Sequence, residues 1–258
     1  MTLSLDDALR QTEDAGVGLD LWWRDDDAVA ATPALERLLG LSNRCGVPVA
    51  LAVIPARVET SLAPRLAEAA GMAVLVHGLS HANHTPSGAR KAELGPHRPL
   101  DAMAADLAEG LRLAMGSFGD RFLPVLAPPW NRIAPALVPT LPDLGYAGLS
   151  AFGPRPARNP TPGLRQVNTH LDPIDWRGGR GLRDRDGLEA DLAEAVLARV
   201  NGATDEPYGL LTHHGVHDEA IWSFCERVWE RLSRSSAVRY PGVAALFSDE
   251  GLPSVTKP

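Results

Sequence analysis

The sequence predicts an α/β protein built on a parallel sheet or barrel. Short apolar runs bounded by Gly or Pro alternate with amphipathic stretches along most of the 258-residue chain. The runs are apolar on both faces, as strands are when helices cover both sides of a sheet. Repeated alternation of strand and helix favours parallel pairing. The predicted strands are residues 18–23, 47–54, 72–77, 122–127, 146–152, 164–171 and 208–213.

The helical stretches between these strands carry recognisable start and stop signals. Thr32 is predicted to cap a helix that has Pro33 in its first turn, and Gly46 is predicted to end it. Apolar residues at three- and four-residue spacing predict three further helices. These cover residues 99–115, 188–200 and 218–232.

Composition predicts a globular protein with a sizeable core, because 45% of the residues are apolar and 22% are charged. The net charge of −7 argues against a nucleic-acid partner. No apolar run reaches about 18 residues, so no membrane span is predicted. The acidic N-terminus shows no export signal, which predicts a cytoplasmic location. Cys45 and Cys225 are predicted to be reduced core thiols.

The domain organisation is predicted to be a single unit over residues 1–258, since the chain shows no internal repeat. The arginine- and glycine-rich stretch at 177–186 is predicted to be a surface loop and not a linker. The oligomeric state cannot be inferred from the sequence.

Reactive side chains gather where the predicted strands end. The carboxyl ends of parallel strands converge on one ligand site in barrels and open sheets. Five separate segments are therefore expected to meet at one place. They are WWRDDD (22–27), HGLSHANH (77–84), APPWN (127–131), THLDPIDW (169–176) and LLTHH (210–214).

The histidine-rich segment contains His77 and His81 at i, i+4 spacing, which is common in zinc sites because both rings can face one point. The same pair also fits a hydrogen-bonded loop, and this alternative stays open. His84 is predicted either to touch the metal or substrate, or to lie outside the site.

Three consecutive aspartates, Asp25–Asp27, repel one another and are costly to bury unless a cation or an arginine balances them. Their position after two tryptophans favours a partly buried site over an exposed acidic turn. His213 and His214 end a strongly apolar run, where idle polar groups are expensive. Asp172 and Asp175 are candidates to orient such a histidine, although the Asp-Pro sequence also suits a plain turn.

The tryptophans divide into two groups. Trp130, flanked by proline and asparagine, is predicted to lie at the site. Trp176, Trp222 and Trp229 are each predicted to be core residues and not carbohydrate-stacking surfaces.

Together these segments resemble the polysaccharide deacetylases, a family of metal-dependent carbohydrate esterases. The family has an Asp-Asp pair after the first strand, then His-Ser/Thr-x-x-His, a proline turn with an aromatic residue, an Asp-x-x-Asp-Trp segment and Leu-x-His. The resemblance spans residues 22–214. The corresponding stretches occur here in the same order: RDDDA, HGLSH, PPWNR, DPIDW and LTH.

The resemblance implies a distorted (β/α) barrel with about seven parallel strands and a divalent metal, most often Zn²⁺. His77 and His81 match the metal histidines. A small residue follows the family's aspartate pair, as alanine follows Asp27 here, so Asp26 aligns with the base and Asp27 with the ligand. The shifted register, with Asp25 as base and Asp26 as ligand, stays open.

The remaining roles follow from the same resemblance. His213 would protonate the leaving group, with Asp172 or Asp175 keeping it cationic. A backbone N–H near Trp130 would help the metal to stabilise the oxyanion. The residues expected around the substrate are Trp130, Asn131 and Arg132.

Two positions depart from the family pattern. The arginine that precedes the proline turn is missing, since Ala127 stands before Pro128. Arg132 or Arg24 could take its place beside the base. The residue after the first metal histidine is Gly78, where the family has Ser or Thr.

The predicted function is hydrolytic removal of N-acetyl or O-acetyl groups from a carbohydrate by a metal-activated water. The expected partner is an N-acetylated sugar or oligosaccharide. One alternative is a hydrolase of another small C–N amide on the same scaffold. The other is a catalytically silent carbohydrate-binding protein, which the missing arginine would favour.

Overall fold

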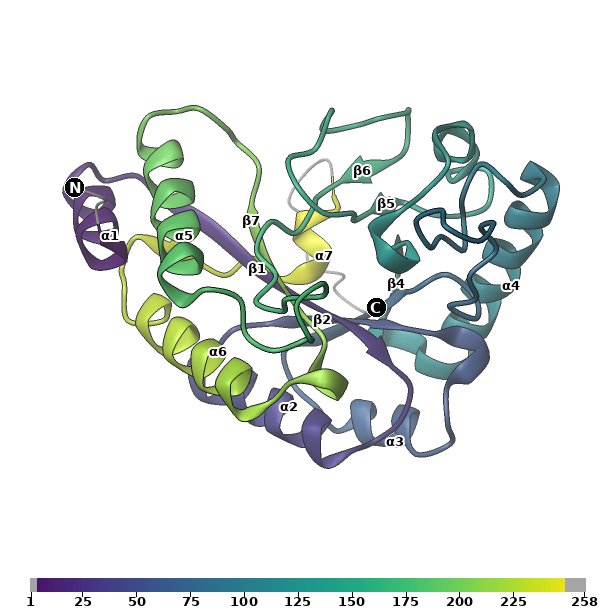
Figure 1. Ribbon diagram of the computed structural model, residues 1–258, viewed down its shortest axis with the longest axis horizontal. Helices are drawn as coiled ribbons and strands as arrows, with labels where there is room; N and C mark the ends of the chain where they lie inside the picture. The colour runs from purple at the N-terminus through teal and green to yellow at the C-terminus, as the bar shows by residue number, and fades with distance from the viewer. Residues whose placement is uncertain (1–3, 249–258) are drawn as a thin grey trace, which may run out of the picture.

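The computed structural model describes residues 4–248 and contains one sheet in which every strand pairs in parallel (Figure 1). The strand order is β6-β5-β4-β3-β2-β1-β7, and a short strand β8 pairs with the start of β1. This confirms the predicted parallel α/β class. The strands are β1 (Leu19–Ala28), β2 (Val49–Val53), β3 (Met72–Val76), β4 (Phe122–Leu126), β5 (Gly148–Leu149), β6 (Arg165–Gln166), β7 (Tyr208–Thr212) and β8 (Val238–Arg239).

The two ends of the sheet are joined by irregular chain and not by a complete strand. Beyond β6, the backbone N–H of His170 donates to the carbonyl of Gly209 (2.6 Å), and the N–H of Leu211 in β7 donates to the carbonyl of Leu171 (2.8 Å). These bonds curl the seven strands from β6 to β7 into the predicted distorted barrel.

Helices cover the outside of this curled sheet, except the short helix α7 (Val243–Leu246), which lies within its curl (Figure 1). The signals predicted for α2 are confirmed: the Thr32 hydroxyl accepts the N–H of Leu35, and Gly46 ends the helix in the left-handed region with φ 64°. The α-helices are α1 (Leu5–Asp14), α2 (Pro33–Cys45), α3 (Leu62–Ala67), α4 (Leu100–Phe118), α5 (Arg185–Val200), α6 (Glu219–Leu232) and α7 (Val243–Leu246). The 3₁₀ helices are η1 (Pro55–Arg57), η2 (Gly119–Arg121), η3 (Pro129–Asn131), η4 (Pro135–Thr140) and η5 (His214–Val216).

Strand alternation separates the core into two layers. In β2, Val49, Leu51 and Val53 belong to the large cluster between sheet and helices, whereas Ala50 and Ala52 belong to a smaller inner cluster. The small inner side chains leave room within the barrel. The inner cluster also contains Trp22 from β1 and three residues at the end of the described chain, namely Val243, Leu246 and Phe247.

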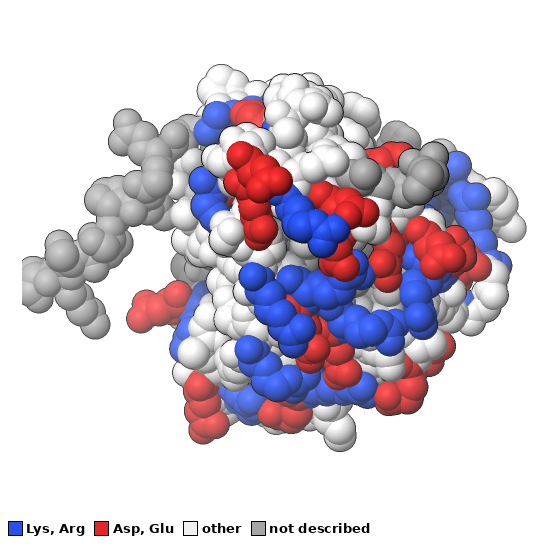
Figure 2. Space-filling view, turned by 90° about the vertical axis from the view of Figure 1, so that its left-hand side faces the viewer, with Lys and Arg blue, Asp and Glu red and all other residues white. Residues whose placement is uncertain are grey.

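Ion pairs tie the outer helices together on the face shown in Figure 2, where basic and acidic side chains interleave. Arg231 on α6 binds Asp6 on α1 (2.9 Å) and Glu189 on α5 (2.8 Å). Cys45 and Cys225 are not joined in a disulfide. Cys225 is a core residue as predicted, whereas Cys45 is only partly buried at the edge of the core. Within residues 4–248, no helix combines the length and apolar character needed to cross a bilayer.

Candidate metal centre

The aspartates lie inside strand β1 and do not follow it. The prediction that the first strand ends at residue 23 was therefore wrong, because β1 continues to Ala28. The ladder with β2 holds through Asp25 and Asp26. Charged residues can remain within a buried strand here because each carboxylate has a basic partner, as described below.

A β-bulge at Asp27 decides where the carboxylates point. Asp26 pairs with Ala52 and Ala28 with Val53, so Asp27 is the additional residue, and it has a φ of 70°. Without the bulge, alternation would send Asp26 and Asp27 to opposite faces. The bulge instead lets both consecutive carboxylates reach the carboxyl-terminal end of the barrel. We refer to this end, with the loops after β1, β3, β4 and β7 and the loop that follows Leu171, as the mouth.

Asp27, His77 and His81 gather at the mouth with ligand atoms within 4.8 Å of one another. The Oδ1 atom of Asp27 lies 3.3 Å from His77 Nε2 and 3.4 Å from His81 Nε2. That oxygen is buried without a hydrogen-bond partner among the described residues. His77 Nδ1 donates to the carbonyl of Ala127 (2.8 Å), which leaves its Nε2 lone pair free for a metal. One carboxylate and two imidazoles form a common donor set for a divalent cation, so the residues present fit one.

Electrostatics favour the charged form of the carboxylate in this group. Burial by itself raises the pKa of Asp27, but the neighbouring His77, His213 and His81 outweigh burial, and the pKa falls well below its usual range. An ionised carboxylate with an unused buried oxygen is the state that binds a cation. The geometry therefore prefers Asp27 over Asp26 as the ligand.

Glu93 shapes the turn that presents His81, a role that no sequence pattern predicted. Its buried carboxylate accepts the backbone N–H groups of Leu79 (3.3 Å), Ser80 (2.9 Å) and His81 (3.2 Å). Gly78 has a φ of 65°, and a Cβ atom there would collide with the Glu93 carboxylate. The glycine that replaces the family's Ser or Thr therefore makes room for an acid that holds the loop.

Arg24 takes the place beside Asp26 that the missing arginine leaves empty. Its Nε and one terminal nitrogen donate to the two oxygens of Asp26, at 2.8 and 3.0 Å. The guanidinium also donates to the carbonyl and hydroxyl of Ser150 and to the side-chain oxygen of Asn131 (2.6 Å). Arg24 is fully buried, so this bidentate pair fixes the orientation of Asp26 and balances its charge.

His213 faces Asp26 across the mouth, with Nε2 of the ring 4.0 Å from Oδ2 of the carboxylate. Its Nδ1 atom is buried without a partner among the described residues. Trp176 packs edge-on against this ring at 4.8 Å, and its indole N–H donates to Asp172 (2.8 Å). Burial raises the pKa of Asp172, although the nearby His213 opposes that shift.

Trp176 therefore corrects one prediction about the tryptophans. It is 44% exposed and is not a core residue. Its side chain cannot be buried because it covers His213 from a loop at the rim of the barrel. Trp222 and Trp229 are buried as predicted. Trp130 lies at the mouth as predicted, with its ring 4.1 Å from that of His81.

Asp25 turns away from the metal donors and binds His214. The two side chains are 2.5 Å apart, and Asp25 also accepts the N–H of His214 (3.0 Å) and the hydroxyl of Thr212 (2.6 Å). Burial opposes ionisation of Asp25, but the charge of His214 and these bonds lower its pKa. A carboxylate satisfied in this way argues against the shifted register. His214, whose role the sequence left open, anchors the chain after β7 to β1.

Three predicted or candidate residues lie outside this constellation. Asp175 accepts the backbone N–H groups of residues 177 and 178, so it shapes a turn. Arg132 donates to the carbonyl of Lys91 (2.6 Å) and not to Asp26. His84 is exposed, and its backbone bonds to Ala92. Of the two predicted partners for His213, the structure therefore favours Asp172.

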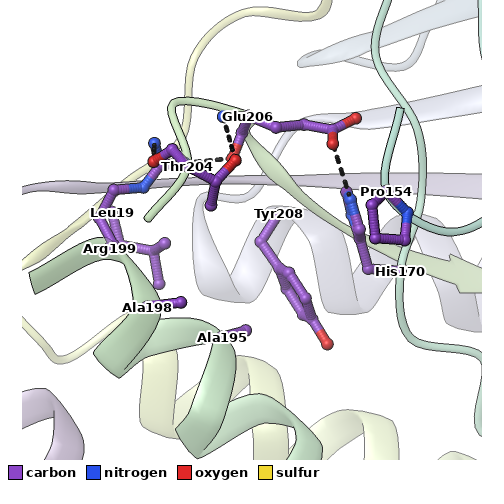
Figure 3. Close-up of a pocket in the computed structure, with 9 residues that line it drawn as sticks. All are labelled: Leu19, Pro154, His170, Ala195, Ala198, Arg199, Thr204, Glu206 and Tyr208. Carbon is purple, nitrogen blue, oxygen red and sulfur yellow. Dashed lines mark hydrogen bonds and ion pairs between the residues drawn. The ribbon is translucent and has the colours of Figure 1, made fainter. Parts of the chain in front are cut away.

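A separate cavity of about 210 Å³ lies at the opposite ends of β1 and β7 (Figure 3). Its wall includes the first residue of each strand, Leu19 and Tyr208, and residues of α5. His170 lies within it, with Nε2 3.3 Å from Glu206 and the ring stacked on Tyr208 at 5.0 Å. This cavity does not include the metal donors.

Comparison with solved structures places the fold. No protein-family model matches the chain, and no curated protein matches it significantly. A proposed polysaccharide deacetylase from Mycobacterium smegmatis superimposes with a TM-score of 0.61 at 15% identity, over 90% of each chain. The chain has the polysaccharide deacetylase fold. A family 4 acetyl xylan esterase from Clostridium thermocellum, in complex with a cobalt ion, has a TM-score of 0.53 at 16% identity, over 91% of this chain and 93% of that one.

The polysaccharide deacetylase fold also occurs in proteins without activity. A mutant of a family 4 carbohydrate esterase pseudoenzyme, with enzymatic activity restored, has a TM-score of 0.58 at 14% identity, over 91% of this chain and 70% of that one. Fold similarity at such identities does not establish catalysis. The argument for activity therefore depends on the residues at the mouth of this chain.

Proposed function

We propose that the protein is a metal-dependent hydrolase that removes an acetyl group from an N- or O-acetylated carbohydrate. The observation that carries the proposal is the cluster of Asp27, His77 and His81 beside the carboxylate that Arg24 holds. A divalent cation held there, proposed to be Zn²⁺, would polarise the acetyl carbonyl and lower the pKa of a bound water.

The chain's own groups supply the proton transfers. Asp26 accepts a proton from the water while the oxygen of that water forms a bond to the acetyl carbon. His213 then donates a proton to the nitrogen as the C–N bond breaks, which yields acetate and an amine. For an ester, the same proton goes to the leaving oxygen. The 4.0 Å between His213 and Asp26 lets the two groups act on one small acyl group.

Aromatic side chains and the proline turn would position the substrate. Trp130 and Trp176 lie beside His81 and His213 respectively, so each covers one side of the reacting centre. Both Trp130 and Asn131 have positive φ angles, near 55°, in the turn after β4. We propose that the Trp130 N–H helps to stabilise the oxyanion.

Arg24 also weakens the rival hypothesis of a silent binding protein. That hypothesis was favoured by the absence of the family's arginine, and the bidentate contact of Arg24 with Asp26 restores its function from another position. A hydrolase of another small amide shares every residue named here. The cytoplasmic location expected from the sequence stays a prediction.

The test is acetate release by zinc-loaded protein from N-acetylated monosaccharides and oligosaccharides. Asp26→Asn should lower kcat by about 10² to 10⁴, because general-base assistance is worth that much. Asp175→Asn, which makes the same substitution at a turn carboxylate in the loop after Leu171, is the matched control and should retain most activity. Equal activity of wild type and Asp26→Asn would refute the proposed mechanism. Sugar binding without acetate release would support the silent binding protein, and release from simple amides alone would support the rival hydrolase.

A further inference from the structure

His213, the proposed acid, is held through its backbone. Its ring Nδ1 atom has no hydrogen-bond partner among the described residues, and Nε2 lies 4.0 Å from Asp26, beyond hydrogen-bond distance. The backbone, by contrast, is fixed on both sides. The carbonyl of His213 accepts the N–H of Val216 (3.0 Å), and the N–H of His213 donates to Nε2 of His217 (3.3 Å). The direction of the ring therefore depends on these two bonds and on its contact with Trp176.

The bond to His217 takes the place of one that the sheet does not supply. The ladder between β1 and β7 ends with Asp25 opposite Thr212, so the N–H of His213 lies one residue beyond it. A backbone N–H at such a place needs another acceptor. The His217 ring, which follows the 3₁₀ helix η5, is that acceptor.

A histidine at position 217 carries a cost. Its Nδ1 atom is buried without a partner among the described residues, and an apolar side chain would avoid that penalty. Burial lowers the pKa of His217 to about 4, so at neutral pH the ring is uncharged and Nε2 is free to accept a hydrogen bond. The imidazole therefore supplies what an apolar residue could not, namely the bond to His213.

Two outer helices hold the His217 ring in place. Trp222 on α6 is buried and packs edge-on against it, with 4.7 Å between the ring centroids. The guanidinium of Arg37 on α2 lies over Trp222, 4.8 Å from the centre of its ring. Arg37 also binds Glu219 (2.6 Å) and Glu226 (3.1 Å) of α6. These contacts connect the outside of the barrel with the acid at the mouth.

We propose that His217 is a positioning residue that aligns His213 for proton donation by accepting its backbone N–H. The inference rests on the proposed function, because it assigns a residue that supports the acid of that reaction. His217 acts only through His213. Its loss should therefore impair proton donation and leave the metal donors and Asp26 intact.

The test compares His217→Leu, which removes the acceptor, with His217→Gln, whose side-chain oxygen can replace Nε2. His170→Leu is the matched control, because Nδ1 of His170 also accepts a backbone N–H, that of Gly209 (3.1 Å), but far from the mouth. Each zinc-loaded protein is given the tetramer of N-acetylglucosamine and the activated ester 4-nitrophenyl acetate. Amide cleavage needs a proton for the leaving nitrogen, whereas nitrophenolate leaves without one.

His217→Leu should lower kcat for the amide about tenfold to a hundredfold at little change in KM, because a small misplacement of a reacting group costs that much. Ester hydrolysis should stay near the wild-type rate. His217→Gln should recover most of the lost kcat, and His170→Leu should match the wild type on both substrates. An equal loss on both substrates, or a His217→Gln variant as impaired as His217→Leu, would overturn the inference.

Amide hydrogen exchange of His213, followed by NMR, tests the same bond without a substrate. The His213 N–H should exchange about tenfold faster in His217→Leu than in the wild type, as expected when one hydrogen bond is lost. His217→Gln should restore the protection. Unchanged exchange in His217→Leu would overturn the inference. Absence of hydrolysis by the wild type, with the expected exchange pattern, would instead refute the proposed function while confirming that His217 fixes the backbone of His213.

Discussion

Two regions of this barrel pair imidazole with carboxylate at almost the same distance, yet they differ in what is left unbonded. At the mouth, Asp27 lies 3.3 and 3.4 Å from two histidines, and in the cavity of Figure 3 Glu206 lies 3.3 Å from His170. Proximity of acid and imidazole therefore does not identify a site.

In the cavity, each of these polar atoms has a protein partner. His170 Nδ1 accepts the N–H of Gly209 (3.1 Å), and Glu206 accepts the N–H groups of Asn168 (3.2 Å) and Arg155 (3.0 Å). At the mouth, Asp27 Oδ1 and His213 Nδ1 are buried without hydrogen-bond partners among the described residues. Buried groups with unused bonding capacity are costly and need a functional explanation. The His170–Glu206 pair therefore supports the fold, whereas the mouth keeps buried polar atoms available to a ligand.

The largest effect on stability should come from Arg24. Arg24→Met leaves the buried Asp26 carboxylate without its partner, which should lower the free energy of unfolding by about 3–5 kcal/mol. The measurement is urea unfolding of both proteins. Arg112→Met, which removes an exposed pair with Glu109, should cost less than about 1 kcal/mol. A similar small loss for Arg24→Met would mean that the buried pair does not hold the mouth together.

The second-largest expected effect is a loss of protein stability at acid pH, caused by protonation of His217. Burial lowers the pKa of His217 to about 4, so the folded protein keeps this ring neutral while the unfolded chain protonates it near pH 6.5. The contribution of the neutral His217 ring to the free energy of unfolding is fully present above pH 6.5. It falls by about 2–3 kcal/mol as the pH drops toward 4.

The check is the free energy of unfolding of wild type and His217→Gln from pH 7.5 to pH 4. The wild type should lose more stability over that interval than the variant. An equal loss of stability in the two proteins would show that His217 does not keep a lowered pKa. The loss of stability in acid would then have another origin.

The smallest effect should follow from His170→Phe in the cavity. It deprives Glu206 and the Gly209 N–H of a partner, so it should cost about 1–3 kcal/mol of stability. Acetate release per folded molecule should stay at the wild-type level, because no proposed reacting group is touched. A fall in kcat at unchanged metal content would contradict the view that the His170–Glu206 pair serves the fold and not the reaction.

The sequence was a good guide to the elements and to the segments that meet. Each of the seven predicted strands has a counterpart, but those predicted at 146–152 and 164–171 shrink to the two-residue strands β5 and β6. The four predicted helices lie where capping and periodicity placed them. It missed the short elements α3, α7 and β8. It also missed α1, whose acidic stretch is stabilised by the cap that Ser4 makes and by packing against α5. Such support comes from tertiary contacts and is not visible in local patterns.

The errors at the site have a common physical cause. A run of aspartates is a poor strand, and only the long-range partners of Asp25 and the local partner of Asp26 let β1 continue. The bulge at Asp27 then decides which carboxylates share a direction. Trp176 and Glu93 act through contacts with residues distant in sequence, so motif spacing gives no signal for them.

The central claim is that the mouth, and not the cavity, binds a metal. The most direct test is the metal content of purified, zinc-reconstituted wild type, His77→Ala/His81→Ala and His170→Ala. The account predicts about one equivalent of zinc in the wild type and in His170→Ala, and almost none in the double variant. Metal that persists in the double variant, or a wild type that binds none after reconstitution with zinc, cobalt or nickel, would contradict it.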